Sequence, residues 1–396
     1  MLILGIDDFK HINDLYDRAF GDEVLRIIAQ RIQELLPGYA QVYRLDGDEF
    51  GVLINEPDRH ELQRVYASLR NVFRRQQECD GKKYYCTLSA GCSRYPEDAD
   101  NYLDLVKYAE YSLEYAKKNG KNRLSFFDRE TLFHKERSLE LIELFRESIE
   151  HNFQGFELYY QPQVYAVSGQ VMGAEALVRW SCEKYGFISP AEFIPLLEQS
   201  GLIIPVGKWI FEQAAAQCKE WTGHNPSFTM SINLSYLQVV DQEFIPFMEQ
   251  TLKKLQLSPA NVVVELTESY LARSSGSVKE IFEHIRSLGI KIAMDDFGTG
   301  YSSLEILKNS PADIVKIDKT FIKDIRSSSF DATFIRFIVA LCHDVGIEVC
   351  LEGLETKEEY SIVSHMQLDY IQGYLFGKPV PKKQFCHDFL LNGSNA

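Results

Sequence analysis

The pattern of hydrophobic and polar residues changes near residue 128. Before it, short β-prone runs at 1–6, 41–43, 50–54 and 84–89 are mixed with helix-like stretches at 21–36 and 103–118, which predicts an α+β domain. After it, short apolar runs alternate with helix-like stretches. These runs lie at 157–160, 171–178, 229–234, 262–266, 291–294, 314–317, 348–351 and 370–371. Eight strands separated by helices predict an α/β (βα)8 barrel.

A helix-like stretch without Gly or Pro lies between the two patterns, at 129–151. We interpret it as a connecting helix. The predicted organisation is an N-terminal domain at 1–128, the connector at 129–151 and a barrel domain at 152–396. A length of 396 residues fits such an arrangement, because single domains rarely exceed about 250–300 residues.

Polar residues stand near the end of five predicted barrel strands. They are Asn233, Glu265, Asp295, Lys316 and Glu352. A single acid after a strand is more often a helix cap. Five polar residues at equivalent positions indicate more than capping, because the C-terminal ends of barrel strands form the active-site face.

Asp295 and Asp296 are adjacent at a predicted strand end, and Gly298 and Gly300 follow them. Two neighbouring carboxylates can serve two hard cations, while glycines let the backbone turn closely past a ligand. The alternative is a helix N-cap followed by a glycine-rich turn. The other carboxylates favour a metal site.

Composition and charge restrict the possible functions. With 45% hydrophobic and 25% charged residues the chain has the composition of a soluble globular protein. A net charge of −15 argues against a nucleic-acid polymer as partner. No apolar run reaches the roughly 20 residues of a membrane span, and no signal peptide precedes the first acids, so we expect no membrane contact from this segment and a cytoplasmic location. The eight cysteines lack zinc-ligand spacing and are expected to be reduced, buried thiols.

The second part of the chain resembles the EAL-domain cyclic di-GMP phosphodiesterases over roughly 155–390. The resemblance rests on an ordered series of short motifs. They are YQP at 160–162, EALVRW at 175–180, SINLS at 231–235, ELTE at 265–268, DDFGTG at 295–300, KID at 316–318, EGLE at 352–355 and QGY at 372–374. It implies a TIM-like barrel that hydrolyses cyclic di-GMP to linear pGpG, using two Mg²⁺ or Mn²⁺ ions per site.

The resemblance also implies a metal-binding role for particular residues. Glu175, Asn233, Glu265 and Asp295 would hold the first ion, and Asp295 would bridge to a second ion held also by Asp296. Carboxylates and amide carbonyls are the oxygen ligands that such ions prefer.

The remaining motif positions would serve catalysis, substrate binding and support. By resemblance, Lys316 would orient the attacking water or stabilise phosphate charge, and Glu352 would act as general base or as a ligand of the second ion; these roles stay open. By resemblance, four further residues would contact the substrate or support the residues that bind it: Gln161, Leu177, Arg179 and Gln372. Glu268 would brace the loop at 296–303, and Glu355 would support Glu352.

Simpler explanations exist for single residues. Arg179 before Trp180 is commonly a surface arginine stacked on an aromatic ring, and Lys316 between Val315 and Ile317 could be a solvated edge lysine. Because every matched metal and catalytic position carries the expected residue type, the sequence favours an active hydrolase over a receptor that binds cyclic di-GMP without cleaving it.

The first part resembles a GGDEF (diguanylate cyclase) domain, with matches at 5–14, 21–22, 44–50 and 116–122. By resemblance, Asn13 and Asp22 would recognise guanine, Asp48 would bind metal, and Lys117 and Lys121 would contact phosphates. The resemblance thus implies a possible GTP site in this domain.

Departures from the GGDEF pattern predict that this domain is catalytically silent. Gly5 replaces an Asp of the family's metal site, Asp46 replaces the first Gly of its signature, and the inhibitory Arg-x-x-Asp motif is absent at 37–40. We predict a degenerate domain that either regulates the barrel by binding GTP or serves as a scaffold. A bifunctional cyclase-phosphodiesterase is the alternative, and Gly5 and Asp46 argue against it. The chain begins almost at the first strand, so we expect an upstream sensor or membrane segment in the full-length protein. The resemblance to EAL domains separately implies a homodimer.

Overall fold

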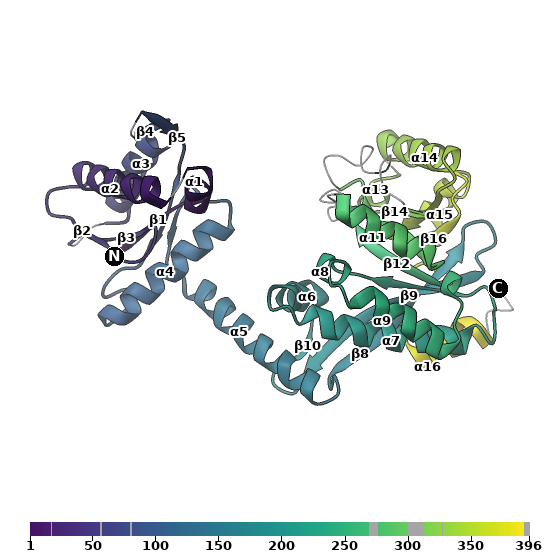
Figure 1. Cartoon of the computed structure of the whole chain (residues 1–396). Coiled ribbons are helices and arrows are strands. Elements are labelled where there is room, and N and C mark those ends of the chain that lie inside the picture. Colours follow the sequence, from purple (N-terminus) through teal and green to yellow (C-terminus); the bar gives the residue numbers. More distant parts are fainter. Residues whose placement is uncertain are drawn as a thin grey trace. The chain divides into compact units, whose positions relative to one another are not determined.

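The computed structural model describes residues 1–16, 18–55, 58–79, 81–268, 276–299, 307, 312–326 and 328–391. Its contacts divide the chain into two compact units, Met1–Leu139 and Glu140–Ala396. The division falls inside helix α5 (Arg129–Glu150), which spans the stretch interpreted as the connector (Figure 1). Leu141 and Phe145 of this helix belong to the core of the second unit. Helix α5 is therefore part of both units, and each unit is described separately below.

The first unit is built on a five-stranded sheet with the order β2-β3-β1-β6-β7. Strand β1 is central and pairs antiparallel with β3 and β6, whereas β7 is a parallel edge strand. The strands are β1 (Leu2–Ile6), β2 (Gln41–Arg44), β3 (Glu49–Leu53), β6 (Leu88–Cys92) and β7 (Leu124–Phe126). A small hairpin of β4 (Gln77–Cys79) and β5 (Lys82–Tyr84) stands apart from the sheet.

Helices cover both faces of this sheet because side chains alternate along β1. Leu2 and Leu4 join a core with residues of helices α2 (Arg18–Leu35) and α3 (Arg59–Phe73). Ile3 packs with Ala109 and Leu113 of helix α4 (Tyr102–Lys118). A short helix, α1 (Phe9–Leu15), follows β1. The α+β architecture predicted for this part is observed.

One predicted strand of the first unit is wrong. The run at 84–89 is split, because β5 ends at Tyr84 and the central strand β6 begins at Leu88. Strand β6 alternates apolar residues with Ser89 and Gly91, and Gly91 is required because a Cβ there would lie 2.0 Å from the carbonyl oxygen of Ala109 in α4. Small residues of this kind give a weak apolar signal, so the sequence pattern placed the strand too early.

The second unit contains a closed barrel, and each predicted apolar run lies on one of its strands. Strands β9 and β11 to β16 run parallel, but β8 is antiparallel to both of its neighbours, β9 and β16. A short turn joins β8 to β9, which is sufficient only for antiparallel strands. The barrel strands are β8 (Phe156–Tyr165), β9 (Val171–Cys182), β11 (Thr229–Asn233), β12 (Val262–Thr267), β13 (Lys291–Phe297), β14 (Ile314–Ile317), β15 (Glu348–Glu352) and β16 (Tyr370–Gln372).

Helices pack around the outside of the barrel (Figure 1). They include α6 (Pro190–Gln199), α7 (Ile203–Trp221), α8 (Tyr236–Val239), α9 (Phe244–Leu255), α11 (Gly276–Ser287), α13 (Thr320–Lys323), α14 (Ser329–Asp344), α15 (Lys357–Val363) and α16 (Lys382–Phe385). Short strands β10 (Gly186–Ile188) and β17 (Val380–Pro381) extend the sheet. Within the described residues, none of the helices has the length and apolar character that a membrane crossing requires.

Candidate active site

The inward-facing side chains of the barrel change from apolar to polar toward the C-terminal ends of the strands. An apolar layer contains Val263, Ala293, Ile314, Cys350 and Tyr370. Side chains two residues apart on a strand point to the same face. The next inward-facing residues on these strands are therefore Glu265, Asp295, Lys316, Glu352 and Gln372. The strand pattern thus places a polar layer directly above the apolar layer, toward the C-terminal ends of the strands.

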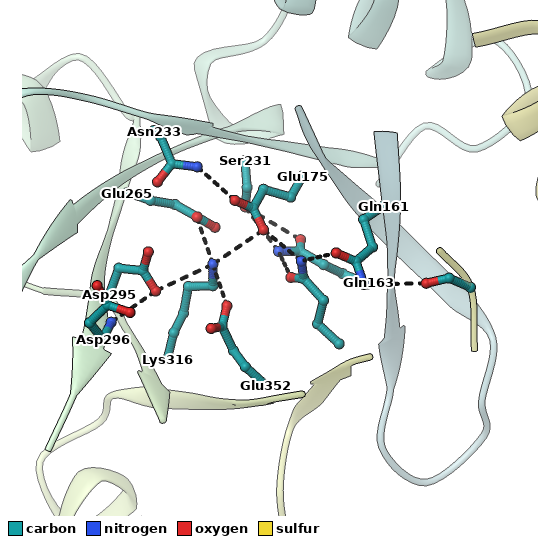
Figure 2. A network of polar contacts seen from close by, with 12 residues as sticks. Gln161, Gln163, Glu175, Ser231, Asn233, Glu265, Asp295, Asp296, Lys316 and Glu352 are labelled. Carbon is teal, nitrogen blue, oxygen red and sulfur yellow. Dashed lines mark hydrogen bonds and ion pairs between the residues drawn. The ribbon is translucent and has the colours of Figure 1, made fainter. Parts of the chain in front are cut away.

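Lys316 lies at the centre of this polar layer (Figure 2). Its side chain is only 2% exposed, and its Nζ lies 2.6 Å from Glu265 Oε2 and 2.6 Å from Glu352 Oε1. Glu175 Oε2 and Asp295 Oδ1 each lie 3.5 Å from the same nitrogen. Four acids of the described residues therefore share one ammonium group, which leaves an excess of negative charge.

Burial and mutual charge shift the pKa values in this layer. Burial acts to lower the pKa of Lys316, but the surrounding carboxylates raise it well above its usual value, so the lysine is charged. Burial, aided by the charge of Glu175, raises the pKa of Glu265. Burial opposes ionisation of Glu175 as well, yet Lys316 and two amide hydrogen bonds lower its pKa. The single ammonium group of Lys316 cannot stabilise the ionised form of all the acids in this layer.

The two adjacent aspartates occupy an irregular strand end. The pairing of β13 with β14 shifts between Met294 and Phe297, and Asp296 has a left-handed backbone with φ of 55°. Its backbone N–H donates to Asp295 Oδ1 at 2.9 Å. Burial and the charge of Asp295 raise the pKa of Asp296 to about 6. This bulge brings successive carboxylates to one side of the barrel mouth, where regular alternation would separate them.

Glu268 contacts the segment that follows these aspartates. Its Oε2 accepts a hydrogen bond from the backbone N–H of Gly298 at 3.1 Å. Gly298 has φ of 97°, and a Cβ there would lie 2.5 Å from the ring of Phe321. Residues 300–303 of the loop, including Gly300, lie outside the described residues.

A chain of buried amides holds Glu175 from the other side. Gln372 Nε2 donates to Glu175 Oε2 at 2.5 Å and to Gln161 Oε1 at 3.2 Å. Gln163 Nε2 donates to Gln372 Oε1 at 3.0 Å and lies 3.3 Å from Ser231 Oγ. The sequence reasoning missed Gln163. The predicted run ended at residue 160, whereas β8 continues to Tyr165 and places Gln161 and Gln163, two residues apart, on the same inner face.

Asn233 and Glu175 are also in direct contact. Asn233 Nδ2 donates to Glu175 Oε1 at 2.6 Å, and Asn233 is paired in register with Glu265 on the next strand. Each oxygen of Glu175 therefore has an amide partner. The structure brings together the residues assigned to the first metal ion by resemblance, and their ligand roles remain predictions.

Leu177 and Arg179 lie farther out on β9, where both side chains are half-buried. The Arg179 guanidinium lies over the ring of Tyr159, 5.6 Å from its centroid. Trp180 faces the opposite side and donates its indole N–H to Ser148 Oγ at 3.1 Å. The arginine thus stacks on an aromatic ring from the neighbouring strand rather than on the tryptophan next to it.

A small cavity of about 220 Å³ lies beside these residues. Leu177, Arg179 and Asn233 line it together with apolar side chains of helices α6 and α7. At its polar side Ser235 Oγ donates to Glu198 Oε1 at 2.6 Å. The cavity offers an apolar surface next to the polar layer.

No contact between the side chains of Glu355 and Glu352 is found among the described residues. The Glu355 side chain is exposed, and its backbone N–H donates to Glu359 Oε2 at 2.9 Å. The supporting role implied by resemblance therefore has no contact behind it in this structure.

The polar layer fits divalent cations. Four acids surround a single lysine, and Glu265 Oε1 is buried without a hydrogen-bond partner, which is costly unless a cation satisfies it. Among the described side chains, however, no three acids, cysteines or histidines already converge on one point. Lys316 takes the central position instead, so its ion pairs must rearrange when a cation binds.

In the first unit, most of the residues assigned to a nucleotide site lie around one cavity of about 390 Å³. Asn13, Asp48, Lys117 and Lys121 line it, whereas Asp22 is not among its lining residues. Lys117 Nζ lies 3.8 Å from Asp48 Oδ2.

Gly5 explains why Lys117 takes this position. A Cβ built on Gly5 would lie 2.7 Å from Lys117 Cε and Nζ. The lysine therefore occupies the space into which an Asp at residue 5 would project. At the hairpin, Gly47 rather than Asp46 has the left-handed backbone, with φ of 49°, so the fold tolerates a side chain at residue 46.

Comparisons with known proteins agree with this arrangement. Residues 1–123 match the family model "Diguanylate cyclase, GGDEF domain" and residues 143–379 match "EAL domain". The chain belongs to the EAL domain family, and a GGDEF domain precedes its EAL domain.

Two of the relatives carry names that describe cyclic di-GMP metabolism. The chain is 32% identical to the bifunctional diguanylate cyclase/cyclic di-GMP phosphodiesterase MucR of Pseudomonas aeruginosa, over 97% of this chain and 56% of MucR. It is 30% identical to the cyclic di-GMP phosphodiesterase PdeR of Escherichia coli, over 97% of this chain and 58% of PdeR. The chain therefore spans little more than half the length of these relatives.

Solved structures show the same barrel. The MucR phosphodiesterase in complex with c-di-GMP is 35% identical with a TM-score of 0.59, and the match covers 62% of this chain and 99% of that one. The EAL enzyme Bd1971 in its cAMP- and cyclic-di-GMP-bound form is 30% identical with a TM-score of 0.60, over 73% of this chain and 75% of that one.

Proposed function

We propose that this chain is a metal-dependent phosphodiesterase that hydrolyses cyclic di-GMP to linear pGpG. The observation that carries the proposal is the buried layer in which Lys316 contacts Glu175, Glu265, Asp295 and Glu352. The similarity to PdeR, named as a cyclic di-GMP phosphodiesterase, and to the MucR complex with c-di-GMP supports the choice of substrate.

Two divalent ions, Mg²⁺ or Mn²⁺, would be held by oxygen ligands of this layer. By resemblance, Glu175, Asn233, Glu265 and Asp295 would hold the first ion, and Asp295 and Asp296 would hold the second. When bound, such ions neutralise the anionic phosphodiester and lower the pKa of an attacking water.

The side chains of the chain itself position the substrate and move protons. Lys316 is charged and buried, so it can donate hydrogen bonds to a phosphoryl oxygen or to the attacking water. Burial raises the pKa of Glu352 to about 8, with Lys316 acting in the opposite direction, and this makes its carboxyl group suited to exchanging a proton near neutral pH. The amide chain from Gln161 and Gln372 holds Glu175 through hydrogen bonds, and Arg179 would pair with a phosphate oxygen.

The small cavity beside the site is proposed to receive a guanine base. Its apolar walls and the polar pair Glu198–Ser235 combine a stacking or packing surface with hydrogen-bonding groups. Leu177 and Arg179 would contact the substrate at its edge. The barrel is also proposed to form a homodimer.

The GGDEF domain is proposed to regulate rather than to synthesise cyclic di-GMP. Gly5 removes a carboxylate, and the ammonium of Lys117 takes the vacated volume next to Asp48, which repels a divalent cation. Asn13, Lys117 and Lys121 still line a cavity that can take an anionic nucleotide. GTP binding there, with an effect on hydrolysis in the barrel, is the proposed regulation.

The test is to incubate the chain separately with cyclic di-GMP and with GTP, in Mg²⁺ or Mn²⁺, and to identify the products by chromatography. The proposal expects linear pGpG from cyclic di-GMP and no cyclic di-GMP from GTP. Formation of cyclic di-GMP would refute the silent GGDEF domain. Calorimetry with GTP tests the regulatory part, which fails if GTP neither binds nor changes the hydrolysis rate.

A further inference from the structure

The first unit contains a second cavity, of about 580 Å³, away from the residues assigned to GTP. It lies between helix α3 and the edge strand β7. Its lining consists of Arg59, Gln63, Tyr66, Arg70 and residues 123–128. Successive members of the set 59, 63, 66 and 70 are one turn apart on α3, so the four side chains form a single stripe along the helix. None of these residues lines the cavity around Asn13 and Lys117.

Three arginines give this cavity a positive charge in a chain whose net charge is −15. Among the described residues, none of Arg59, Arg70 and Arg123 forms an ion pair with a carboxylate. Arg123 Nη1 donates to the carbonyl oxygen of Asn119 at 2.6 Å, which leaves most of its donors available. Asp128 also lines the cavity, and its Oδ1 accepts the backbone N–H of Glu130 at 3.3 Å.

The two ends of the cavity differ in chemistry. At one end, Arg70 and Arg123 line the cavity together with Tyr66, and Arg70 lies one turn of α3 after Tyr66. The hydroxyl itself donates to the carbonyl oxygen of Leu88 at 2.8 Å and is fixed. Two arginines that line the same end of a cavity suit a phosphate, which arginine binds with paired hydrogen bonds.

At the other end, Arg59 forms a flat platform. Its guanidinium carbon lies 4.3 Å from the centroid of the Phe126 ring, and its side chain is exposed. One face of the guanidinium thus packs on the phenyl ring, and the other face is open. Nucleobases stack on arginine planes of this kind. Gln63, between the two ends of α3, adds an amide that can bond to a ribose or a base edge.

We infer that this cavity is a binding site for a nucleoside phosphate, with the phosphate at Arg70 and Arg123 and the base on Arg59. Its volume is within the range of small-ligand pockets and exceeds what a lone phosphate requires. The site is separate from the barrel and from the predicted GTP site, so it goes beyond the proposed function.

The test is calorimetric titration of the full chain with GMP in EDTA, which removes the divalent cations that the proposed barrel site requires. We expect saturable binding at one site per chain. The double variant Arg70→Gln/Arg123→Gln should weaken it at least tenfold. Arg64→Gln is the matched control, because Arg64 is an exposed arginine of the same helix outside the cavity, and it should bind as the unmodified chain does. If the double variant does not fold, the single variant Arg123→Gln replaces it, because residue 123 lies in a loop; it too should weaken GMP binding.

Two further titrations separate this site from the alternatives. Arg59→Gln should weaken GMP binding but leave the binding of inorganic phosphate unchanged, and Asp22→Ala should leave GMP binding intact. The inference is overturned if GMP does not saturate, if the double variant binds GMP as well as the control does, or if Asp22→Ala abolishes binding. Equal affinity for GMP and inorganic phosphate would overturn the role of Arg59 as a base platform.

Discussion

Lys316 Nζ and Glu352 Oε1 lie 2.6 Å apart inside the barrel mouth. Glu265 shares the same ammonium group at 2.6 Å, and Glu175 and Asp295 are within 3.5 Å. The lysine therefore balances part of the negative charge that the proposed cations would balance in the active enzyme. The first two predictions below follow from this relationship.

Lys316→Met should abolish turnover and make the protein depend on metal for its stability. The variant loses the central cation, so four acids remain without their buried partner, at a cost of about 3–5 kcal/mol for a broken buried pair. We expect at least a 100-fold lower rate, a lower Tm in EDTA, and a larger rise in Tm on adding Mn²⁺ than in the unmodified chain. Differential scanning fluorimetry measures the shifts.

Lys323→Met is the control for Lys316→Met, because Lys323 is an exposed lysine on the short helix that follows β14. It should change neither the rate nor the response to Mn²⁺. A Lys316→Met protein with a near-normal rate would remove this lysine from the mechanism.

Glu265→Gln should weaken metal binding. Glu265 Oε1 is buried without a hydrogen-bond partner, and a neutral amide offers only one weak oxygen ligand there. We expect the rise in Tm with Mn²⁺ to shrink, and the Mn²⁺ concentration for half-maximal rate to increase at least tenfold. An unchanged metal dependence would show that Glu265 is not a ligand.

Gln163→Leu should lower kcat although Gln163 is absent from the residues assigned to metal or substrate. Its amide holds Gln372, which in turn donates to Glu175. Loss of this link frees Glu175 to reorient, so we expect roughly a tenfold lower kcat with a smaller change in KM. Gln163→Asn keeps the amide donor but shortens its reach, whereas Gln163→Glu keeps the reach but loses the donor to Gln372 Oε1; we expect neither to restore the full rate.

Gln170→Leu serves as the control for Gln163→Leu, because Gln170 is exposed in the turn between β8 and β9. It should keep the normal rate. A Gln163→Leu protein indistinguishable from this control in kcat would disprove the positioning role.

Native cysteine reactivity should be confined to two of the eight thiols. Cys182 and Cys386 are half-buried, while the other six are buried. Burial raises the pKa of Cys86 to about 12 and that of Cys342 to about 11, so their thiolates are scarce at pH 8. Ellman's reagent should titrate two thiols in the folded protein and eight in guanidinium chloride. Rapid labelling of a Cys182→Ser/Cys386→Ser variant would contradict this.

Much of the barrel was predictable because its strands are apolar runs of regular spacing with polar residues at equivalent ends. The polar layer follows from that pattern and from period-two alternation, as Ile314 and Lys316 show. The antiparallel direction of β8 and the bulge at Asp296 were not predictable, since both depend on pairing between strands rather than on composition. The same limitation explains the misplaced strand at 84–89, whose small residues are chosen by contact with α4.

The occupation of the Gly5 space by Lys117 also needed the structure. The sequence shows the lost carboxylate, but only packing shows which side chain fills its place. The arginine cavity between α3 and β7 has the same origin, because Arg70 and Arg123 are separated along the chain and meet only in the fold.

The central claim is that the layer around Lys316 cleaves cyclic di-GMP. The most direct measurement compares the unmodified chain with Glu175→Gln for binding of cyclic di-GMP and for its conversion, followed by chromatography in Mn²⁺. The account predicts linear pGpG from the unmodified chain and no detectable product from Glu175→Gln. Binding of cyclic di-GMP without any product from the unmodified chain would contradict it and would identify a receptor instead.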